Sequence, residues 1–325
     1  MLKFVDKNMN VQLPNKNLAP IILFVFNRPH HTKKTIDALR KNKLAIESRL
    51  FIFSDGPRSK FDIKNVSEVR KFIKTIVGFK EINIVERKRN LGLAQSIING
   101  VTEIVNRNGK VIVLEDDMIS SPYFLKFMND SLSYYQNSKE VISIQGYMYP
   151  VKNQLPETFF LRMADCWGWA TWDRGWELFE PNGQLLLDQL KKRKLECDFD
   201  LNYSYGYTKM LKDQISGQVD SWAIRWYASI FLKNKLGLYP GRSLISNIGM
   251  DGTGQHSGSH EYLDTSIEMA PISISKITIE EDLYSRKQIE NYFLFRKKNF
   301  LSSIKNKVKR LYLKLNTKYF FLHDY

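Results

Sequence analysis

The chain has 325 residues, of which 43% are hydrophobic and 13% aromatic, a composition typical of a folded globular protein with one or two domains. Its net formal charge is +15, but residues 286–325 contain eleven Lys or Arg and only two acidic residues, and so carry +9 of it. The preceding 285 residues carry only +6, which argues against a nucleic-acid-binding core.

The cysteines and the hydropathy pattern indicate a compartment. Cys166 and Cys197 are too few for a disulfide framework and lack the spacing of metal ligands. No stretch approaches the roughly 18 apolar residues of a membrane-spanning helix, and the N-terminus lacks the apolar core of a signal peptide. We therefore expect a cytoplasmic protein.

The first part of the chain alternates short apolar runs with helical patterns. The apolar runs predict four strands, at residues 21–26, 50–53, 82–85 and 111–114. Apolar residues spaced three and four apart predict helices after each of the first three, beginning near residues 29, 63 and 91. Strands linked by crossover helices predict an α/β fold, with a mostly parallel sheet covered by helices on both faces.

Polar residues follow each predicted strand. They are Asn27 and Arg28, then Asp55, then residues 87–90, and finally Glu115, Asp116 and Asp117. In parallel α/β sheets, ligands bind beyond the carboxyl ends of the strands. Each set alone could be ordinary cap or turn chemistry. Together they predict a crevice of interleaved charges that suits a nucleotide diphosphate with its metal.

The acidic triplet at residues 115–117 is the most informative of these sets. Neighbouring carboxylates repel one another and resist burial unless a cation compensates them. Hard oxygen ligands suit Mg²⁺ or Mn²⁺, and a metal held by few protein groups usually shares its coordination shell with substrate phosphates. A bare acidic turn is the alternative.

After residue 150 the sequence becomes irregular and rich in aromatic residues. Residues 166–176 contain four tryptophans, which is consistent either with core packing or with a platform that stacks on sugar rings. Helical patterns follow at residues 188–195 and 205–215. A further helix is expected to begin near Asp220 and Ser221, either of which could be its N-cap.

Residues 249–258 include four glycines. Such a segment is unfavourable in a helix or strand interior, and beside a ligand site it predicts a lid that orders over a diphosphate. His256 within it could donate a hydrogen bond to phosphate or bind the metal, or it could be a solvated loop residue.

The C-terminal segment 288–315 places apolar and aromatic residues at helical spacing with lysines between them. This pattern predicts a basic amphipathic helix. It could attach the protein to an anionic membrane surface, with about 1 kcal/mol from each basic residue. Alternatively, it could fold back on the domain with its charged face solvated.

The ordered set of motifs resembles that of the GT-A glycosyltransferases, most closely the inverting N-acetylglucosaminyltransferase I family and the bacterial family-two-like surface-polysaccharide transferases. The resemblance extends from about Pro20 to His256. The segments that carry it are residues 26–28, 54–56, 91–94, 115–117, 168–169 and 219–222.

This resemblance implies a donor site and a metal site. Arg28 and Asp55 would hold the uridine and phosphate end of the donor. Asn27, Asn90 and His256 would complete the donor site.

The same resemblance assigns the acidic triplet and the later motifs. Asp117 would bind Mn²⁺ or Mg²⁺, while Glu115 and Asp116 would face the sugar and ribose. Asp220 falls where such enzymes keep the catalytic base. The wall of the acceptor or sugar site would be formed by Trp167, Gly168 and Trp169.

Two positions depart from the family pattern. The family often has Asp where this chain has Asn27. Asp220 is followed by Ser221 rather than by a second acidic or amide residue.

The expected protein is a metal-dependent inverting glycosyltransferase. It would move a sugar from a nucleotide diphosphate donor, a UDP-sugar first, to a glycan or lipid-linked acceptor in cell-surface polysaccharide synthesis at the inner face of the membrane. Residues 1–150 would bind the donor, 151–275 the acceptor, and 276–325 would form an extension. A nucleotidyltransferase that makes nucleotide sugars, or a catalytically silent sugar-binding protein at the membrane, are the alternatives.

Overall fold

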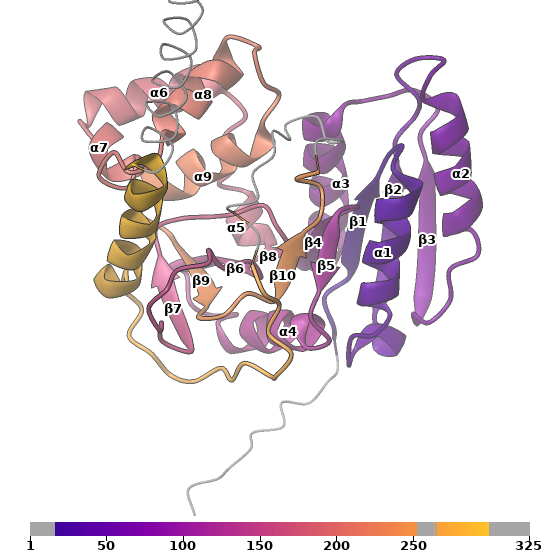
Figure 1. Cartoon of the computed structure of the whole chain (residues 1–325), viewed down its shortest axis with the longest axis horizontal. Helices are drawn as coiled ribbons and strands as arrows, with labels where there is room; N and C mark the ends of the chain where they lie inside the picture. Colours follow the sequence, from indigo (N-terminus) through magenta and orange to yellow (C-terminus); the bar gives the residue numbers. More distant parts are fainter. Residues whose placement is uncertain (1–16, 252–262, 264, 299–325) are drawn as a thin grey trace, which may run out of the picture.

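The computed structural model describes residues 17–251, 263 and 265–298 of the chain (Figure 1). In chain order, the elements are β1 (Ile21–Val25), α1 (Pro29–Leu39), the 3₁₀ turn η1 (Ala45–Glu47), β2 (Arg49–Ser54), α2 (Ile63–Ile73), β3 (Glu81–Glu86), α3 (Leu93–Asn108), β4 (Lys110–Glu115), β5 (Met118–Ser120), α4 (Phe124–Tyr134), β6 (Val141–Gln145), β7 (Thr158–Leu161), β8 (Trp169–Trp172), α5 (Asp173–Trp176), α6 (Gly183–Lys192), α7 (Glu196–Phe199), α8 (Tyr207–Ile215), α9 (Trp222–Leu232), β9 (Leu236–Pro240) and β10 (Ile245–Asn247).

An eight-stranded sheet forms the centre of the molecule, in the order β3-β2-β1-β4-β8-β6-β9-β7. Strands β3, β2, β1 and β4 pair in parallel, as do β6 and β9. Strands β8 and β7 run antiparallel to their neighbours, and β5 and β10 form a separate antiparallel pair. This mostly parallel sheet with flanking helices confirms the α/β, Rossmann-like GT-A class predicted from the sequence.

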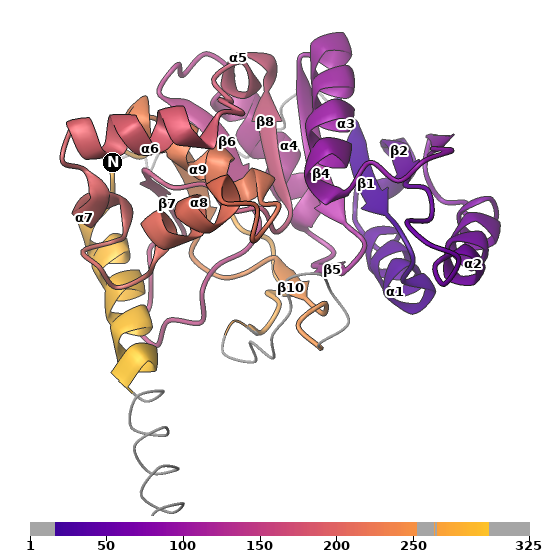
Figure 2. The ribbon, with the colours of Figure 1, turned by 90° about the horizontal axis from the view of Figure 1, so that it is seen from above.

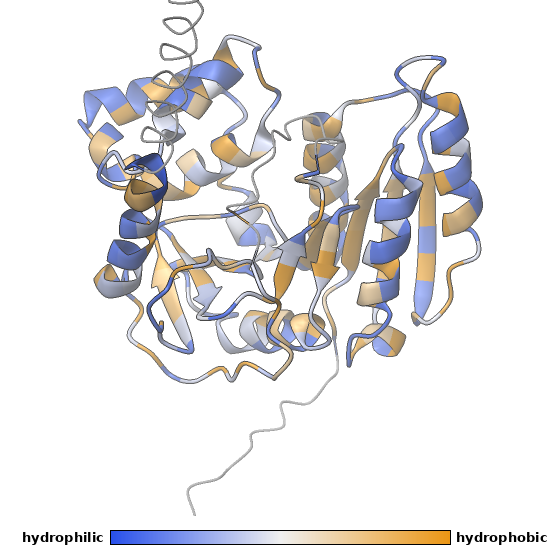
Figure 3. Cartoon of the chain, in the orientation of Figure 1, coloured by the Kyte–Doolittle hydropathy of each residue, from blue (hydrophilic) through white to orange (hydrophobic). Residues whose placement is uncertain are grey.

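Alternate residues of the central strands pack on opposite faces of the sheet, as the period of two in a strand requires. Ile21 and Leu23 of β1 join a buried cluster with residues of α1, α2 and α4. Ile22 and Phe24 join a second cluster, with residues of α3. Figure 2 shows α3 on one side of the sheet and α1 and α2 on the other, and Figure 3 shows polar residues on the side of α1 that faces away from the sheet.

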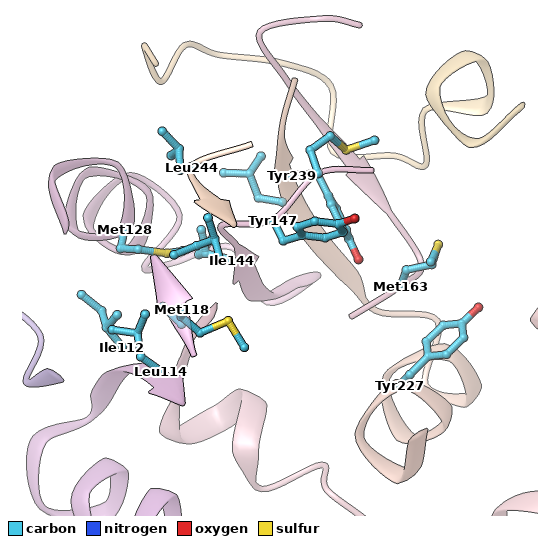
Figure 4. Packing of buried hydrophobic residues seen from close by; sticks show 14 of the residues in the cluster. Ile112, Leu114, Met118, Met128, Ile144, Tyr147, Met163, Tyr227, Tyr239 and Leu244 are labelled. Atoms are coloured by element: carbon cyan, nitrogen blue, oxygen red, sulfur yellow. The ribbon is translucent and has the colours of Figure 1, made fainter. Parts of the chain in front are cut away.

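The two halves of the chain share a buried core. Ile112 and Leu114 of β4 belong to the same cluster as Tyr227 of α9 and Tyr239 of β9 (Figure 4). The part of the chain before residue 150 and the described part after it are therefore packed as parts of one domain.

The tryptophan-rich segment forms β8 and α5, and Trp169 and Trp176 belong to the second cluster, the one that also contains residues of α3. Trp169 is 0% exposed, and its ring stacks on that of Trp222, with centroids 5.3 Å apart. Trp176 and Trp226 complete the cluster. The prediction that Trp169 presents a face to a sugar is therefore wrong, because the ring is enclosed by other side chains. For this residue, the alternative of core packing holds.

The described part of the C-terminal extension packs against the domain. Residues 283–298 are helical, and Ile289 and Phe293 are 0% and 4% exposed. These side chains face the core, so for residues 288–298 the alternative of a helix folded back on the domain holds, and contact of the segment with a membrane stays a prediction. Residues 299–315 fall outside the described residues, and among those described no helix is long and apolar enough to span a bilayer.

Arg286 fastens this helix to the domain. It is 6% exposed and pairs with Asp198, Glu281 and Glu290. Burial opposes its charge, but these carboxylates outweigh the desolvation, so the pKa of Arg286 is raised. Removing one member of such a network would leave a buried charge uncompensated.

Both the backbone conformation and the surroundings of position 168 require a glycine. Its φ is +65°, and a Cβ at this position would lie 2.6 Å from Cγ1 of Ile245. Gly217 has a similar φ of +76°, but a Cβ there would meet no heavy atom of the described residues within 4 Å. We predict that Gly168→Ala lowers the free energy of unfolding by about 3 kcal/mol, because overpacking adds to the strain of a positive φ.

The matched variant Gly217→Ala is expected to cost only about 1 kcal/mol, since it introduces the backbone strain alone. Denaturant unfolding of both variants measures the difference. Equal losses would mean that the contact with Ile245 relaxes without cost.

Candidate active site

A cavity of about 1170 Å³ opens at the edge of the sheet where the parallel strands end. The loops that follow β1, β2, β3 and β4 line one part of it, and residues of α8, α9 and the C-terminal helix line the other. Of the predicted site residues, the cavity is lined by Asn27, Arg28, Asp55, Asn90, Glu115, Asp116, Asp117, Trp167 and Asp220. Parallel strands deliver their carboxyl ends to a single edge, which is why these distant segments converge.

Arg28 meets the acidic triplet because β1 and β4 are neighbours in the sheet. Its guanidinium bridges Asp116 and Asp117, with 2.8 Å between Nη2 and Oδ2 of Asp117. The backbone N–H of Phe26 donates to Asp116 at 3.4 Å. Arg28 was predicted to hold the donor phosphates, and in this structure it lies beside the carboxylates that were expected to face the donor and its metal.

One guanidinium faces three carboxylates in this corner, and the pKa values reflect the imbalance. Burial, reinforced by Asp117 and Asp116, raises the pKa of Glu115 to about 8. Burial also raises the pKa of Asp116 to about 6, against the pull of Arg28. For Arg28, desolvation opposes the charge, but the two aspartates outweigh it and raise the pKa. The corner therefore favours a further cation.

The carboxylate oxygens of this corner suit a divalent metal that is bound by few protein groups. Oδ1 of Asp117 is buried and has no hydrogen-bond partner among the described residues, and such an orphaned carboxylate oxygen is a hard ligand of the kind that Mg²⁺ and Mn²⁺ take. Within the same part of the chain, no group of three or more His, Cys, Asp or Glu side chains is placed to hold a metal. A metal at this corner would need further oxygen ligands from a bound molecule, and a diphosphate has such oxygens.

The start of the glycine-rich segment lies directly against Asp117. The N–H of Ile248 donates to the carbonyl of Asp117 at 2.9 Å, and a Cβ on Gly249 would lie 2.1 Å from Oδ2 of Asp117. Gly249 thus allows the backbone to approach the carboxylate. His256 and the rest of the predicted lid lie outside the described residues.

Asp55 organises the loop that precedes α3. It is 5% exposed, and its carboxylate accepts backbone hydrogen bonds from Gly56, Leu91 and Gly92 at 2.9 to 3.2 Å. Asn90 reaches back to donate to the carbonyl of Gly56 at 2.7 Å. The structure therefore gives Asp55 and Asn90 a structural task at the cavity rim, and their contact with a donor stays a prediction.

Asn27 is held away from the acidic corner. Its amide donates to Oδ1 of Asp62 at 2.7 Å, and Asp62 also accepts from the N–H of Ser59 at 3.1 Å. This chain of hydrogen bonds fixes the loop after β1 against the loop after β2. Asn27 still lines the cavity.

Asp220 lines the same cavity at the beginning of α9. The hydroxyl of Ser221 accepts from the N–H of Ile224 at 3.3 Å, so Ser221 is the N-cap. Asp220 does not cap the helix, its side chain is 64% exposed, and its Oδ1 lies 3.8 Å from Nη2 of Arg225. It lies near the Asp55 loop, because a Cβ on Gly92 would be 3.7 Å from its Oδ2.

The predicted sugar wall is retained only in part. Trp167 is half-buried and lines the cavity, packing edge-on against Tyr147 with ring centroids 4.6 Å apart. Gly168 is enclosed by Ile245 and Phe124 and acts through its backbone conformation. Trp169, as described above, lies in the core.

Sequence reasoning missed a carboxylate and several tyrosines on the other side of the cavity. Asp165 accepts hydrogen bonds from Tyr149 at 2.8 Å and Tyr239 at 3.1 Å, and Tyr149 contacts the hydroxyl of Tyr207 at 3.3 Å. A signal was present, because Tyr149 follows an apolar run at 141–145 just as Arg28 follows the first strand. Identifying that run as a strand would have placed Tyr149 at the same edge.

Asp165 provides a test by pH. Burial raises its pKa from 3.8 to about 6, although the two tyrosines oppose the shift. Between these values the folded protein binds more protons than the unfolded chain, so this group lowers the free energy of unfolding as the pH rises from about 4 to about 6. We predict that Asp165→Asn loses less stability than wild type across this interval, measured by denaturant unfolding at several pH values.

Asp188→Asn is the matched control, since Asp188 is exposed on α6. Its profile should follow that of wild type. A profile of Asp165→Asn parallel to wild type would show that Asp165 titrates normally.

Neither a family model nor a curated protein matches the chain. Among solved structures, it is similar to the mannosyltransferase PcManGT from Pyrobaculum calidifontis in complex with GDP-Man and Mn²⁺ (TM-score 0.38, 8% identity, 67% of this chain and 70% of that one). It is also similar to a UDP-glucose pyrophosphorylase complexed with UDP-glucose (0.36, 12%, 69% and 90%) and to S. aureus TarS (0.29, 11%, 42% and 23%). All three TM-scores are below 0.5, so the function is inferred from the site itself.

Proposed function

We propose that the protein is an inverting glycosyltransferase that moves a sugar from a nucleotide diphosphate donor, a UDP-sugar first, to an acceptor hydroxyl. One observation carries this proposal: a single cavity has a charged corner made of Arg28 and three carboxylates, and an exposed carboxylate, Asp220, on another wall. The first suits a diphosphate leaving group with a cation, and the second suits removal of a proton from an acceptor.

The charge of the corner supports a donor that arrives with a metal. With Asp116 and Asp117 ionised, two negative charges already face a single guanidinium, and Glu115 adds a third only above its raised pKa of about 8, so a diphosphate alone would be repelled. Asp117 would hold the metal through its orphaned Oδ1, and the bound metal would act as a Lewis acid on the departing diphosphate. Arg28, already fixed by two ion pairs, presents its charge without further ordering.

Asp220 is the proposed general base. Its carboxylate is exposed to the cavity and is not used as a helix cap, so it can take a proton from an acceptor hydroxyl. In one displacement, the acceptor oxygen bonds to the anomeric carbon as the bond to the diphosphate breaks, which inverts the configuration. The released proton goes to Asp220.

The acceptor is proposed to be a glycan, with a lipid-linked glycan of cell-surface polysaccharide synthesis as the particular case. The expected contact with an anionic membrane now concerns only residues 299–315, beyond the described part of the tail. A cytoplasmic location stays a prediction.

Asp117 is tested through nucleotide binding rather than through turnover. We predict that UDP or GDP raises the melting temperature of wild type more with Mn²⁺ than without it. Asp117→Asn should lose this metal-dependent increment and keep the metal-free shift, because it loses a charged oxygen ligand.

Asp188→Asn, on the surface of α6, serves as the control and should behave as wild type. A full manganese increment in Asp117→Asn would refute the metal assignment. If no nucleoside diphosphate stabilised wild type at all, the proposed donor class would be wrong.

Asp220 is tested by separating turnover from binding. Asp220→Asn should lower turnover with the productive nucleotide sugar about 100-fold or more while leaving donor affinity near wild type, because only proton transfer is lost. Equal losses of turnover and donor affinity would indicate a structural role. Release of pyrophosphate from a nucleotide and a sugar phosphate would instead identify a nucleotidyltransferase.

A further inference from the structure

The aromatic side of the cavity contains a polar group that the proposed mechanism leaves unused. Asp165 lies between β7 and β8 and lines the cavity. An ionised carboxylate can accept about four hydrogen bonds, and two tyrosine hydroxyls supply one to each oxygen. No Lys or Arg of the described residues pairs with it. A partly buried carboxylate with unused acceptor positions and no paired cation is stabilised by a ligand that donates hydrogen bonds to it.

The tyrosines hold Asp165 in a fixed orientation. Tyr239 is 0% exposed and supports Oδ2 from β9, whereas Tyr149 supports Oδ1 from the loop after β6. Burial raises the pKa of both tyrosines well above the ordinary value, so they remain protonated donors. The remaining acceptor positions of Asp165 are therefore prearranged, which lowers the ordering cost of binding.

Aromatic rings that line the same cavity are linked to this carboxylate through Tyr149, whose ring lies 5.1 Å from that of Phe293 between centroids. Tyr205 packs against Tyr207 and Phe293, with ring centroids 4.6 and 4.5 Å apart, and all three line the cavity. Trp167 lines it as well. A pyranose ring presents apolar C–H faces and hydroxyl donors around its edge. An aromatic wall with one oriented acceptor is complementary to that pattern.

We propose that Asp165 and these aromatic rings form the subsite for the acceptor sugar, with Asp165 accepting hydrogen bonds from its ring hydroxyls. The term acceptor rests on the proposed glycosyl transfer. The loops after β1 to β4 surround Arg28, where the nucleotide diphosphate is proposed to bind. Asp165 and the aromatic residues come from the chain after β6, so their part of the cavity is left for the acceptor.

The experiment is saturation-transfer difference NMR on the full chain with UDP or GDP and Mg²⁺ present, since Mg²⁺ is diamagnetic and does not broaden the ligand signals. The probes are the methyl glycosides of glucose, galactose, mannose and N-acetylglucosamine, and choline as a cationic probe. At least one glycoside should receive saturation from wild type, and Asp165→Asn should reduce that signal at least fivefold. Trp167→Ala should also reduce it, which keeps the test valid if the first variant folds poorly.

Asp200→Asn is the matched control. Asp200 is a buried carboxylate that accepts from the N–H of Thr208 at 2.6 Å, and it does not line the cavity. Its glycoside signal should equal that of wild type. The nucleotide signals in the same spectra should be unchanged in Asp165→Asn.

The subsite is overturned if no glycoside binds wild type, if Asp165→Asn and Trp167→Ala both leave the signal unchanged, or if only choline binds. A different result is a wild type that gives a glycoside signal that needs Asp165 but no nucleotide signal. That result would refute glycosyl transfer and support the sugar subsite. The two failures are therefore distinguishable.

Discussion

The ion pairs of Arg28 with Asp116 and Asp117 join the ends of β1 and β4 at the edge where the cavity opens. Arg28 neutralises the three carboxylates only in part. Burial and the neighbouring carboxylates therefore raise the pKa values of Glu115 and Asp116. A divalent cation that arrives together with a diphosphate changes the net charge of this corner little. A diphosphate is therefore easier to accommodate at this corner with a divalent cation than without one.

The sequence predicted the fold before residue 150 well because the strands and helices there carry distinct periodicities. Buried parallel strands appear as short apolar runs, and α1, α2 and α3 have apolar residues at helical spacing. The end of each strand then locates Arg28, Asp55 and the acidic triplet at one edge. Contacts between side chains were not predictable in this way, so the pairing of Arg28 with Asp116 and Asp117 required the structure.

The part of the chain after residue 150 was predicted poorly for an equally physical reason. Its strands are short, and β7 and β8 reverse direction, so no regular alternation of strand and helix marks them. A tryptophan looks the same in sequence whether it fills a core or faces a ligand, and only the position of Trp169 in a central strand decides between these. Asp165 was missed because its tyrosine partners come from distant positions, before and after it in the chain.

The helix at residues 283–298 reaches the cavity through Phe293, which is nearly buried and contacts Tyr149 and Tyr205. Arg286 ties the same helix to the domain. An exchange of C-terminal segments between related chains would therefore preserve the aromatic wall only if the crossover point lay after this helix. A crossover before it would bring in a foreign ring, or none, and substrate selectivity would evolve together with the tail.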